Sequence, residues 1–87
     1  MQGVYILQGI KNLKYYIGST DNLERRLKEH FKGLVHTTKR FLPVKLVFFQ
    51  QYDDIKVARR IEYKIKKLKR KDIIERIIKE KIITMGL

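Results

Sequence analysis

Several side chains in this sequence are of types that can act on a phosphate group, and five of them are candidates for one site. Hydrolysis of a phosphodiester needs an activated water, neutralisation of charge on the phosphoryl oxygens and a proton for the leaving oxygen. Tyrosine hydroxyls, an arginine, a histidine and a carboxylate together offer these functions. The arginine stays charged and donates paired hydrogen bonds to phosphate oxygens, a task at which lysine is poorer. The candidates are Tyr5, Tyr16, Arg26, His30 and Glu62.

Residue type alone leaves two of these assignments open. Arg25 stands beside Arg26 and carries the same side chain. Glu62 suits Mg²⁺ or Mn²⁺, because such ions keep several waters and need few carboxylates. It also precedes Lys66 by four residues, which is the spacing of an ordinary ion pair on a helix. His30 is a natural proton acceptor, since an unperturbed histidine titrates near pH ~6.5.

The first thirty residues are predicted to hold four of these side chains on a hairpin and a helix. Two β-rich runs, beginning at Gly3 and Tyr15, flank a polar segment at 9–14 that contains glycine and asparagine. This pattern is typical of a β-hairpin, although a loop of this length does not fix the register. A helix follows, on which Arg26 and His30 are four residues apart and therefore share one face.

Capping residues predict where three helices begin. Asp21 and Glu24 have capping-box spacing, Asp53-Asp54 caps a second helix, and Asp72 with Glu75 repeats the capping box for a third. Each helix also has an apolar stripe that is predicted to face the core. In chain order, the stripes are Leu23, Leu27 and Phe31 or Leu34; Val57 or Ala58, Ile61, Ile65 and Leu68; and Ile73, Ile74, Ile77, Ile78 and Ile82.

The segment 34–43 is predicted to be a polar, basic loop. Gly33 just before it is expected to end the first helix. Hydroxyl groups and cations both suit phosphate oxygens, whereas the alternative is a plain solvated loop. The residues predicted to contact nucleic acid are Thr37, Thr38, Lys39, Arg40 and, on the later helix, Lys66.

The order of these elements predicts the fold class. The run 45–52 is β-branched and aromatic and is predicted to be the third strand, which gives the order β-β-α-β-α-α. This order indicates an α/β protein of the α+β type, with a small three-stranded, mainly antiparallel sheet flanked by helices. The 87 residues are predicted to form a single domain, 1–87. A domain of this size buries about 60–65% of its unfolded surface, which favours a shallow cleft over a deep small-molecule pocket.

The same residues carry a resemblance to a known family. Gly3-Val4-Tyr5 and Tyr16-Ile17-Gly18, followed in order by Arg26, His30 and Glu62, resemble the motifs of the GIY-YIG endonucleases. The chain is most similar to the short, stand-alone members of that family, which contain little beyond the catalytic domain. Either tripeptide alone is a weak signal, but five matches in order are specific.

The resemblance implies roles that residue type leaves open. It selects Arg26 over Arg25 for the scissile phosphate, because Arg26 stands ten residues after Tyr16. It also implies that Glu62 holds a divalent metal and that Tyr16, with the first-motif tyrosine beside it, acts on the attacking water. We expect Tyr16 to position this water and His30 to take the proton, and the choice of final acceptor between them stays open.

Over about residues 3–71, where the resemblance extends, the chain departs from the family pattern at two points. Val4 stands where the family name has isoleucine, which is an exchange of one apolar residue for another. Some members carry an asparagine after the metal-binding glutamate, and this chain has no counterpart, because its asparagines are Asn12 and Asn22.

Composition favours a polyanionic partner. Twenty-one lysines and arginines against nine acidic residues give a net charge of +12. Such self-repulsion does not stabilise a fold, so nucleic acid is the favoured partner, with solubility or anionic lipid as alternatives. There is no cysteine for disulfides or thiolate metal sites, no apolar run near membrane-spanning length and no signal-peptide pattern. The protein is therefore predicted to be cytoplasmic or nuclear, with no membrane partner.

The sequence thus predicts a metal-dependent endonuclease that acts on DNA with Mg²⁺ or Mn²⁺. Recognition is expected to follow nucleic-acid structure rather than sequence, because phosphate contacts position a protein without reading bases. One alternative is a basic nucleic-acid-binding module that keeps the nuclease fold with little or no cleavage. Another is a nuclease or binding domain for RNA. Pathway and oligomeric state stay open.

Overall fold

The structure is a computed structural model that describes residues 1–84. Its strands and helices, in chain order, are β1 (Gly3–Gly9), β2 (Tyr15–Thr20), α1 (Leu23–Phe31), α2 (His36–Lys39), β3 (Val44–Gln51), α3 (Ile55–Leu68) and α4 (Lys71–Glu80). This confirms the predicted α+β class and order, with one addition: the segment predicted as a loop at 34–43 contains the short helix α2. The last three residues of the predicted domain 1–87 lie outside the described residues.

The sheet is antiparallel throughout and has the order β2-β1-β3. β1 and β2 form the predicted hairpin, in a register that pairs Tyr5 with Gly18 and Leu7 with Tyr16. On its other side β1 pairs with β3, with an irregularity between Ile6 and Leu7. The first-motif strand is therefore the centre of the sheet, and the second-motif strand is an edge.

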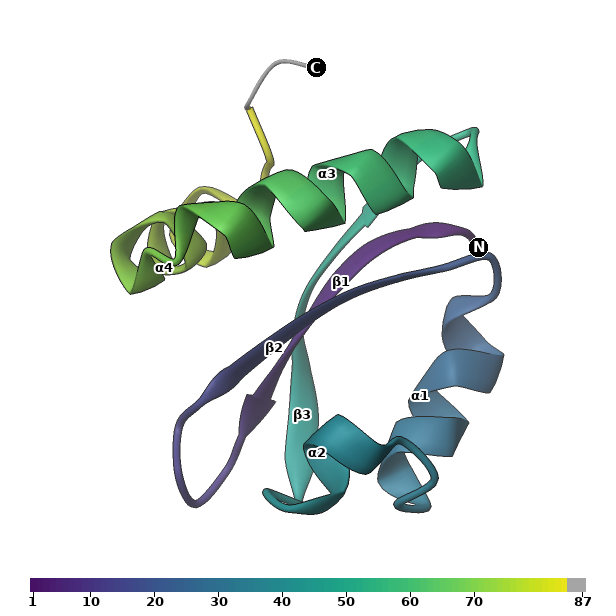
Figure 1. Cartoon of the computed structure of the whole chain (residues 1–87), viewed down its shortest axis with the longest axis vertical. Coiled ribbons are helices and arrows are strands. Elements are labelled where there is room, and N and C mark those ends of the chain that lie inside the picture. The colour runs from purple at the N-terminus through teal and green to yellow at the C-terminus, as the bar shows by residue number, and fades with distance from the viewer. Residues whose placement is uncertain (85–87) are drawn as a thin grey trace.

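Helices cover both faces of this sheet (Figure 1). Successive side chains of a strand point to opposite faces, and β1 is apolar on both. Val4 and Ile6 lie in the cluster that includes α3 and α4, whereas Tyr5 and Leu7 lie in the cluster that includes α1. The chain thus has two small cores separated by one sheet.

The α3–α4 layer follows the predicted stripes closely. Ala58, Ile61 and Ile65 are buried on α3, and Ile77 is buried on α4. Fully burying an isoleucine side chain contributes about 1.5–3 kcal/mol, so this stripe is a main stabilising contact. The prediction was wrong at Ile82, which follows the end of α4 and is 48% exposed; the neighbouring Ile83 is buried instead. The prediction was also wrong at Leu68, the last residue of α3, which is 43% exposed because the helix ends there.

The stripe predicted for α1 was wrong at its C-terminal end. Leu23 is buried and Leu27 packs beside it, but Phe31 and Leu34 are 51% and 70% exposed. The reason is helix geometry: at about 3.6 residues per turn, position i+7 lies about 20° from position i, whereas i+8 lies about 80° away, at the edge of the inward face. Leu34 lies beyond the end of α1. The inward position seven residues after Leu23 is His30, which is fully buried. A polar residue therefore occupies the place that an apolar residue was predicted to fill.

Helix caps agree with the prediction for one helix of three. Asp54 caps α3, and its carboxylate accepts a hydrogen bond of 2.8 Å from the backbone N–H of Lys56. The capping residue of α1 is Asn22, not the predicted Asp21, which forms an ion pair with Arg25 on the surface. At α4 the predicted cap Asp72 lies inside the first turn, paired with Arg70, and the cap position has no side-chain bond.

Gly33 marks the end of α1. It follows the helix with φ +76°, a left-handed conformation that suits glycine, as predicted for the end of this helix.

Among residues 1–84, no helix combines the length and the apolarity needed to cross a lipid bilayer.

The cap of α1 gives a direct stability test. Asn22 accepts a 3.1 Å hydrogen bond from the backbone N–H of Arg25, so Asn22→Ala should lower the free energy of unfolding by about 1 kcal/mol. Asp21→Ala is the matched control, because it removes only an exposed ion pair and should cost clearly less. Urea denaturation of both variants measures the difference. A larger loss for Asp21→Ala would place the cap at Asp21.

Candidate active site

A buried hydroxyl on β1 connects the central strand to α1. Tyr5 is fully buried, and its oxygen lies 2.7 Å from His30 Nε2. Arg26 Nε donates a 3.3 Å hydrogen bond to the same oxygen. The i,i+4 spacing predicted to put Arg26 and His30 on one helical face therefore brings both to a single tyrosine.

Gly18 provides the space for this tyrosine. In the hairpin register Gly18 lies opposite Tyr5, and a Cβ atom at position 18 would collide with the Tyr5 oxygen. The nearest neighbour of this glycine is thus the phenol ring of Tyr5, which lies across it.

Tyr16 lies next to this cluster with its hydroxyl available. Its ring centroid is 6.2 Å from that of Tyr5 and 5.1 Å from that of His30. The ring is only partly buried. Among residues 1–84 the Tyr16 hydroxyl makes no hydrogen bond, and no buried side-chain polar atom there lacks a partner, so this hydroxyl is open to solvent.

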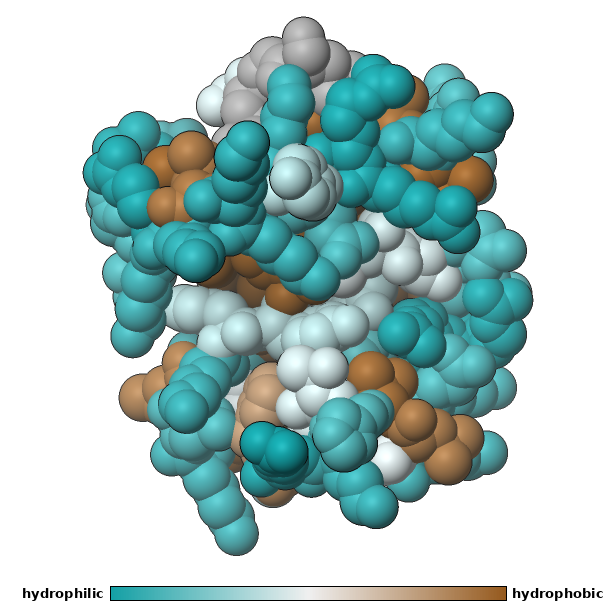
Figure 2. Space-filling model, in the orientation of Figure 1, coloured by the Kyte–Doolittle hydropathy of each residue, from teal (hydrophilic) through white to brown (hydrophobic). Residues whose placement is uncertain are grey.

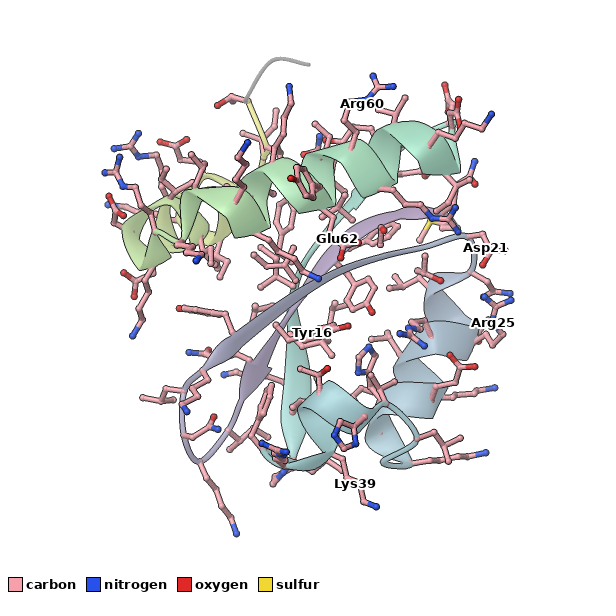
Figure 3. The ribbon with its side chains drawn as sticks, viewed as in Figure 1. Tyr16, Asp21, Arg25, Lys39, Arg60 and Glu62 are labelled. Carbon is pink, nitrogen blue, oxygen red and sulfur yellow. The ribbon has the colours of Figure 1, made fainter. Side chains whose placement is uncertain are left out.

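Glu62 approaches from the other helical layer. Its carboxylate accepts a short hydrogen bond from the Ser19 hydroxyl on β2 and pairs with Lys66 Nζ at 2.6 Å. The same Lys66 ammonium stands 5.5 Å from the centroid of the Tyr16 ring, which links Glu62 to Tyr16. In Figure 3 the labelled Glu62 and Tyr16 lie on either side of the β2 ribbon. The ion pair that the sequence left as an alternative for Glu62 is therefore present.

Burial sets the electrostatics of the cluster. Desolvation, with a further contribution from the Arg26 charge, lowers the pKa of His30 to about 4. Burial likewise raises the pKa of Tyr5 well above its usual value, against the opposing effect of the Arg26 hydrogen bond. Partial burial disfavours the charge of Arg26, but hydrogen bonds to Tyr5 and Glu29 outweigh it and raise the pKa of the guanidinium. At neutral pH the cluster therefore holds a neutral phenol, a neutral imidazole and one firmly charged arginine.

The five predicted site residues divide into two groups. Tyr5 and His30 are fully buried, whereas Arg26, Tyr16 and Glu62 are part-exposed. The expectation of an ordinary histidine pKa was wrong, because His30 is sealed between two hydroxyl groups. Sequence reasoning also missed the Ser19 contact with Glu62 and the Glu29 contact with Arg26; Glu29 lies at i+3 from Arg26, a spacing that could have revealed it.

Of the residues predicted to contact nucleic acid, most lie on the surface and one is buried. Lys39 and Arg40 are exposed, and Thr37 and Lys66 line a surface groove. Thr38 is fully buried, with its hydroxyl 2.7 Å from His30 Nδ1, so its prediction as a phosphate contact was wrong. The reason is that residues 36–39 form a helical turn that directs this side chain inward.

The groove beside Tyr16 has a volume of about 590 Å³ and an apolar floor with a basic rim. Figure 2 shows this hollow, with apolar side chains inside it and hydrophilic side chains around it. Sequence reasoning missed most of the rim, because its cations come from the hairpin loop and from the α3–α4 junction, which are far apart in the chain. These cations are Lys14, Lys66, Lys69, Arg70 and Lys71.

Comparison with known protein families shows the class to which the chain belongs. The model of the GIY-YIG catalytic domain matches residues 1–77, and the chain belongs to the GIY-YIG endonuclease family. It is 40% identical to a UPF0213 protein of Clostridium perfringens over 83 residues, which cover 94% of this chain and 88% of the relative. It is 46% identical to a UPF0213 protein of Bacillus licheniformis over 68 residues, covering 76% and 68% of the two chains.

A third relative, a UPF0213 protein of Syntrophus aciditrophicus, is 37% identical over 76 residues, covering 85% of this chain and 86% of its own length. The names of these relatives state no activity. No solved structure matches the chain. The family therefore establishes the nuclease class, while substrate and cofactor are questions for the site itself.

The buried histidine makes the stability of the protein depend on pH. The pKa of His30 is about 4 in the folded protein and about 6.5 in an unfolded chain, so the folded state excludes the proton. This contribution to stability is fully present above pH 6.5 and is lost as the pH falls towards 4. As the pH falls through this range, the free energy of unfolding of the wild type should therefore decrease by up to about 1.4 kcal/mol more per pH unit than that of His30→Gln.

Urea denaturation at several pH values between 7 and 4 measures this difference. Since His36 is exposed on α2, His36→Gln is the matched control and should retain the wild-type slope. Equal slopes for wild type and His30→Gln would show that His30 takes up its proton as easily in the folded chain as in the unfolded one.

Proposed function

We propose that this protein is a divalent-metal-dependent endonuclease that hydrolyses phosphodiester bonds in DNA. One observation carries the proposal: Arg26, Tyr16 and Glu62 are the part-exposed members of the motif set, and a basic groove begins at Tyr16. Cleavage requires one phosphate to reach all three groups: the groove is lined by Tyr16 and by Lys66, the ion-pair partner of Glu62, while Arg26 lines a second polar hollow together with Ser19.

Arg26 is suited to hold the scissile phosphate. Its Nε atom is bound to Tyr5 and its Nη1 atom to Glu29, and these contacts fix the plane of the guanidinium. Among residues 1–84 its Nη2 atom has no partner, so this edge is available to a phosphate oxygen. A charge held in place before substrate binds stabilises the developing negative charge without reorganisation.

Tyr16 is better placed than His30 to meet the attacking water. The Tyr16 hydroxyl is solvent-accessible and unpaired, whereas both ring nitrogens of His30 are engaged inside the protein. Burial also makes His30 a weak base, with a pKa of about 4. We therefore assign to Tyr16 the orientation of the water, and to Tyr5 and His30 the support of Arg26 from the interior.

Glu62 is the residue that would hold Mg²⁺ or Mn²⁺. Among residues 1–84 no three histidine, cysteine or acidic side chains gather in a metal-binding group, which excludes a closed protein cage there. A single part-exposed carboxylate, already oriented by Ser19, fits an ion that keeps several waters and takes further ligands from phosphate. Its pairing with the Lys66 ammonium indicates that this position favours a cation. Such an ion supplies Lewis-acid neutralisation of the phosphoryl oxygens and lowers the pKa of bound water.

The groove supports a nucleic-acid path towards these residues. Its rim combines cations from the hairpin loop, α3 and α4, and the chain as a whole carries +12. Lysines and arginines bind phosphates without regard to base identity, so recognition by nucleic-acid structure is favoured over recognition by sequence.

Cleavage assays on two pairs of matched variants test the catalytic assignment. Glu62→Gln should abolish Mg²⁺- or Mn²⁺-dependent cleavage and leave DNA binding intact or slightly tighter, because one negative charge leaves a phosphate-facing surface. Glu75→Gln makes the same change at an exposed position on α4 and should cleave normally. Arg26→Ala should lose most cleavage and about 1.5–3 kcal/mol of binding. Arg25→Ala, which removes only a surface pair, should lose little.

The assay uses labelled single-stranded, duplex and branched DNA, with RNA as a parallel substrate, in the presence of Mg²⁺, Mn²⁺ or a chelator. Cleavage that survives unchanged in Glu62→Gln would reveal a contaminating nuclease. Salt-sensitive binding without any cleavage would favour the alternative of a nucleic-acid-binding module. Cleavage of RNA but not of DNA would show that the substrate is RNA.

The groove makes a separate prediction about binding. Lys14→Ser combined with Lys71→Ser removes two rim cations and should reduce DNA affinity at low salt. On duplex DNA the slope of log K against log salt should become shallower by about 0.9 for each phosphate that the variant no longer neutralises. Lys28→Ser with Lys32→Ser removes the same charge from exposed positions outside the groove and should change the slope less. Fluorescence anisotropy at several salt concentrations measures both, and equal effects would contradict a path through the groove.

A further inference from the structure

Thr38 is a buried polar residue that the proposed chemistry leaves without a role. It lies on α2, is fully buried, and has its hydroxyl 2.7 Å from His30 Nδ1. The opposite ring nitrogen, Nε2, is 2.7 Å from the Tyr5 hydroxyl. The imidazole is thus held between two hydroxyl groups, each of which could donate or accept.

The neighbours of Tyr5 decide the direction of the first hydrogen bond. Arg26 also contacts the Tyr5 oxygen, but a guanidinium has no acceptor atom, so it donates. Tyr5 is fully buried, and among residues 1–84 the acceptor within reach of its proton is His30 Nε2. The phenol therefore donates to Nε2, and this nitrogen carries no hydrogen.

The direction of the second hydrogen bond follows from the first. A neutral imidazole without hydrogen on Nε2 carries it on Nδ1 and donates to Thr38 Oγ1. The Thr38 proton then points away from the ring, where the backbone carbonyl of Val35 lies 3.5 Å from Oγ1. Each residue therefore donates to the next: Arg26 to Tyr5, Tyr5 to His30, and His30 to Thr38.

The opposite direction would leave a buried donor without a partner. With hydrogen on Nε2, the Tyr5 oxygen would accept from both His30 and Arg26, and its own proton would have no acceptor. Such a buried, unsatisfied donor is strongly disfavoured. The arrangement therefore has one favourable direction, provided that position 38 can accept a hydrogen bond.

We propose that Thr38 is a positioning residue that holds His30 in its Nδ1–H tautomer. In this state the Tyr5 hydroxyl donates inward, and its lone pairs face Arg26 Nε, which keeps the guanidinium in the orientation that presents Nη2 outward. The effect on cleavage rests on the proposed function of Arg26. The tautomer of His30 does not, so it can be measured whether or not the protein cleaves DNA.

The experiment measures the ¹⁵N chemical shifts of the His30 ring at pH 7 by long-range ¹H–¹⁵N correlation in the labelled full chain. Wild type should show the Nδ1–H tautomer. Thr38→Val keeps the shape but removes the acceptor, and it should shift His30 towards the Nε2–H form or a mixture. Thr38→Ser keeps the hydroxyl and should restore the wild-type pattern, while Thr84→Val, at an exposed position, should leave it unchanged.

Cleavage kinetics provide the functional arm. Thr38→Val should lower kcat/KM by about tenfold, because the Arg26 guanidinium that holds the scissile phosphate is then less fixed in orientation. Thr38→Ser should recover most of kcat/KM.

An Nε2–H tautomer in wild type would overturn the proposal, and so would a Thr38→Val protein that folds and keeps the Nδ1–H form. If Thr38→Val fails to fold, Thr38→Ser still tests the proposal. The serine hydroxyl can accept the same hydrogen bond from His30, so a tautomer that differs from that of the wild type would contradict the proposal. The expected tautomers in a protein without cleavage would overturn the proposed function and leave the assignment of Thr38 standing.

Discussion

The burial of the Tyr5 hydroxyl is the constraint around which one half of this molecule is arranged. A phenol at the centre of a sheet must find hydrogen-bond partners inside the protein, because an unpaired buried donor costs about 1–3 kcal/mol. Its partners are His30 and Arg26 on α1, so the helix is fixed in position along the strand. Gly18 on the neighbouring strand leaves room for the ring. The tyrosine thus sets the position of the helix, and the helix sets the position of the surface arginine.

The position of β2 at the sheet edge explains how two layers contribute to one surface. Residues on opposite faces of a central strand are separated by the sheet itself. At an edge, however, side chains from both faces can approach the same rim, and Tyr16 from the α1 side meets Lys66 of α3, which in turn pairs with Glu62. The second motif, with Tyr16, therefore lies on the edge strand β2, where its tyrosine can reach both layers. The first motif lies on the central strand β1, where Tyr5 contacts the protein interior.

Much of the fold was predictable from local patterns, because these patterns depend on few residues. The hairpin, the third strand and the apolar stripe of α3 follow from alternation, turn composition and helical spacing. The shared face of Arg26 and His30 follows from the i,i+4 rule. The wrong stripe on α1 has a simple origin: hydrophobicity favoured Phe31, whereas helix geometry places His30 inward. Residue type and spacing do not predict that a histidine is buried as long as its hydroxyl partners are unknown.

The parts of the site that sequence could not predict depend on contacts between distant segments. Thr38 looked like one of several polar loop residues, and only the helical turn α2 directs it to His30. Ser19 reaches a glutamate 43 residues away, and the groove rim joins cations from the hairpin loop and the α3–α4 junction. No local spacing rule connects such residues. The motif match identified the five candidate site residues, but it could not divide them into buried and exposed groups.

The order of the strands also has a consequence for the chain while it is being made. The central strand leaves the ribosome before both of its partners, and its outer partner β3 begins at Val44, so the sheet closes only after a long intervening segment has been synthesised. Non-local pairings of this kind form late, because the entropy of closing the intervening loop must be overcome first. Glu62 follows on α3, after all three strands. A chain that ends before residue 62 lacks the carboxylate assigned to the metal, so the proposed nuclease becomes competent only after both the sheet and α3 have been synthesised.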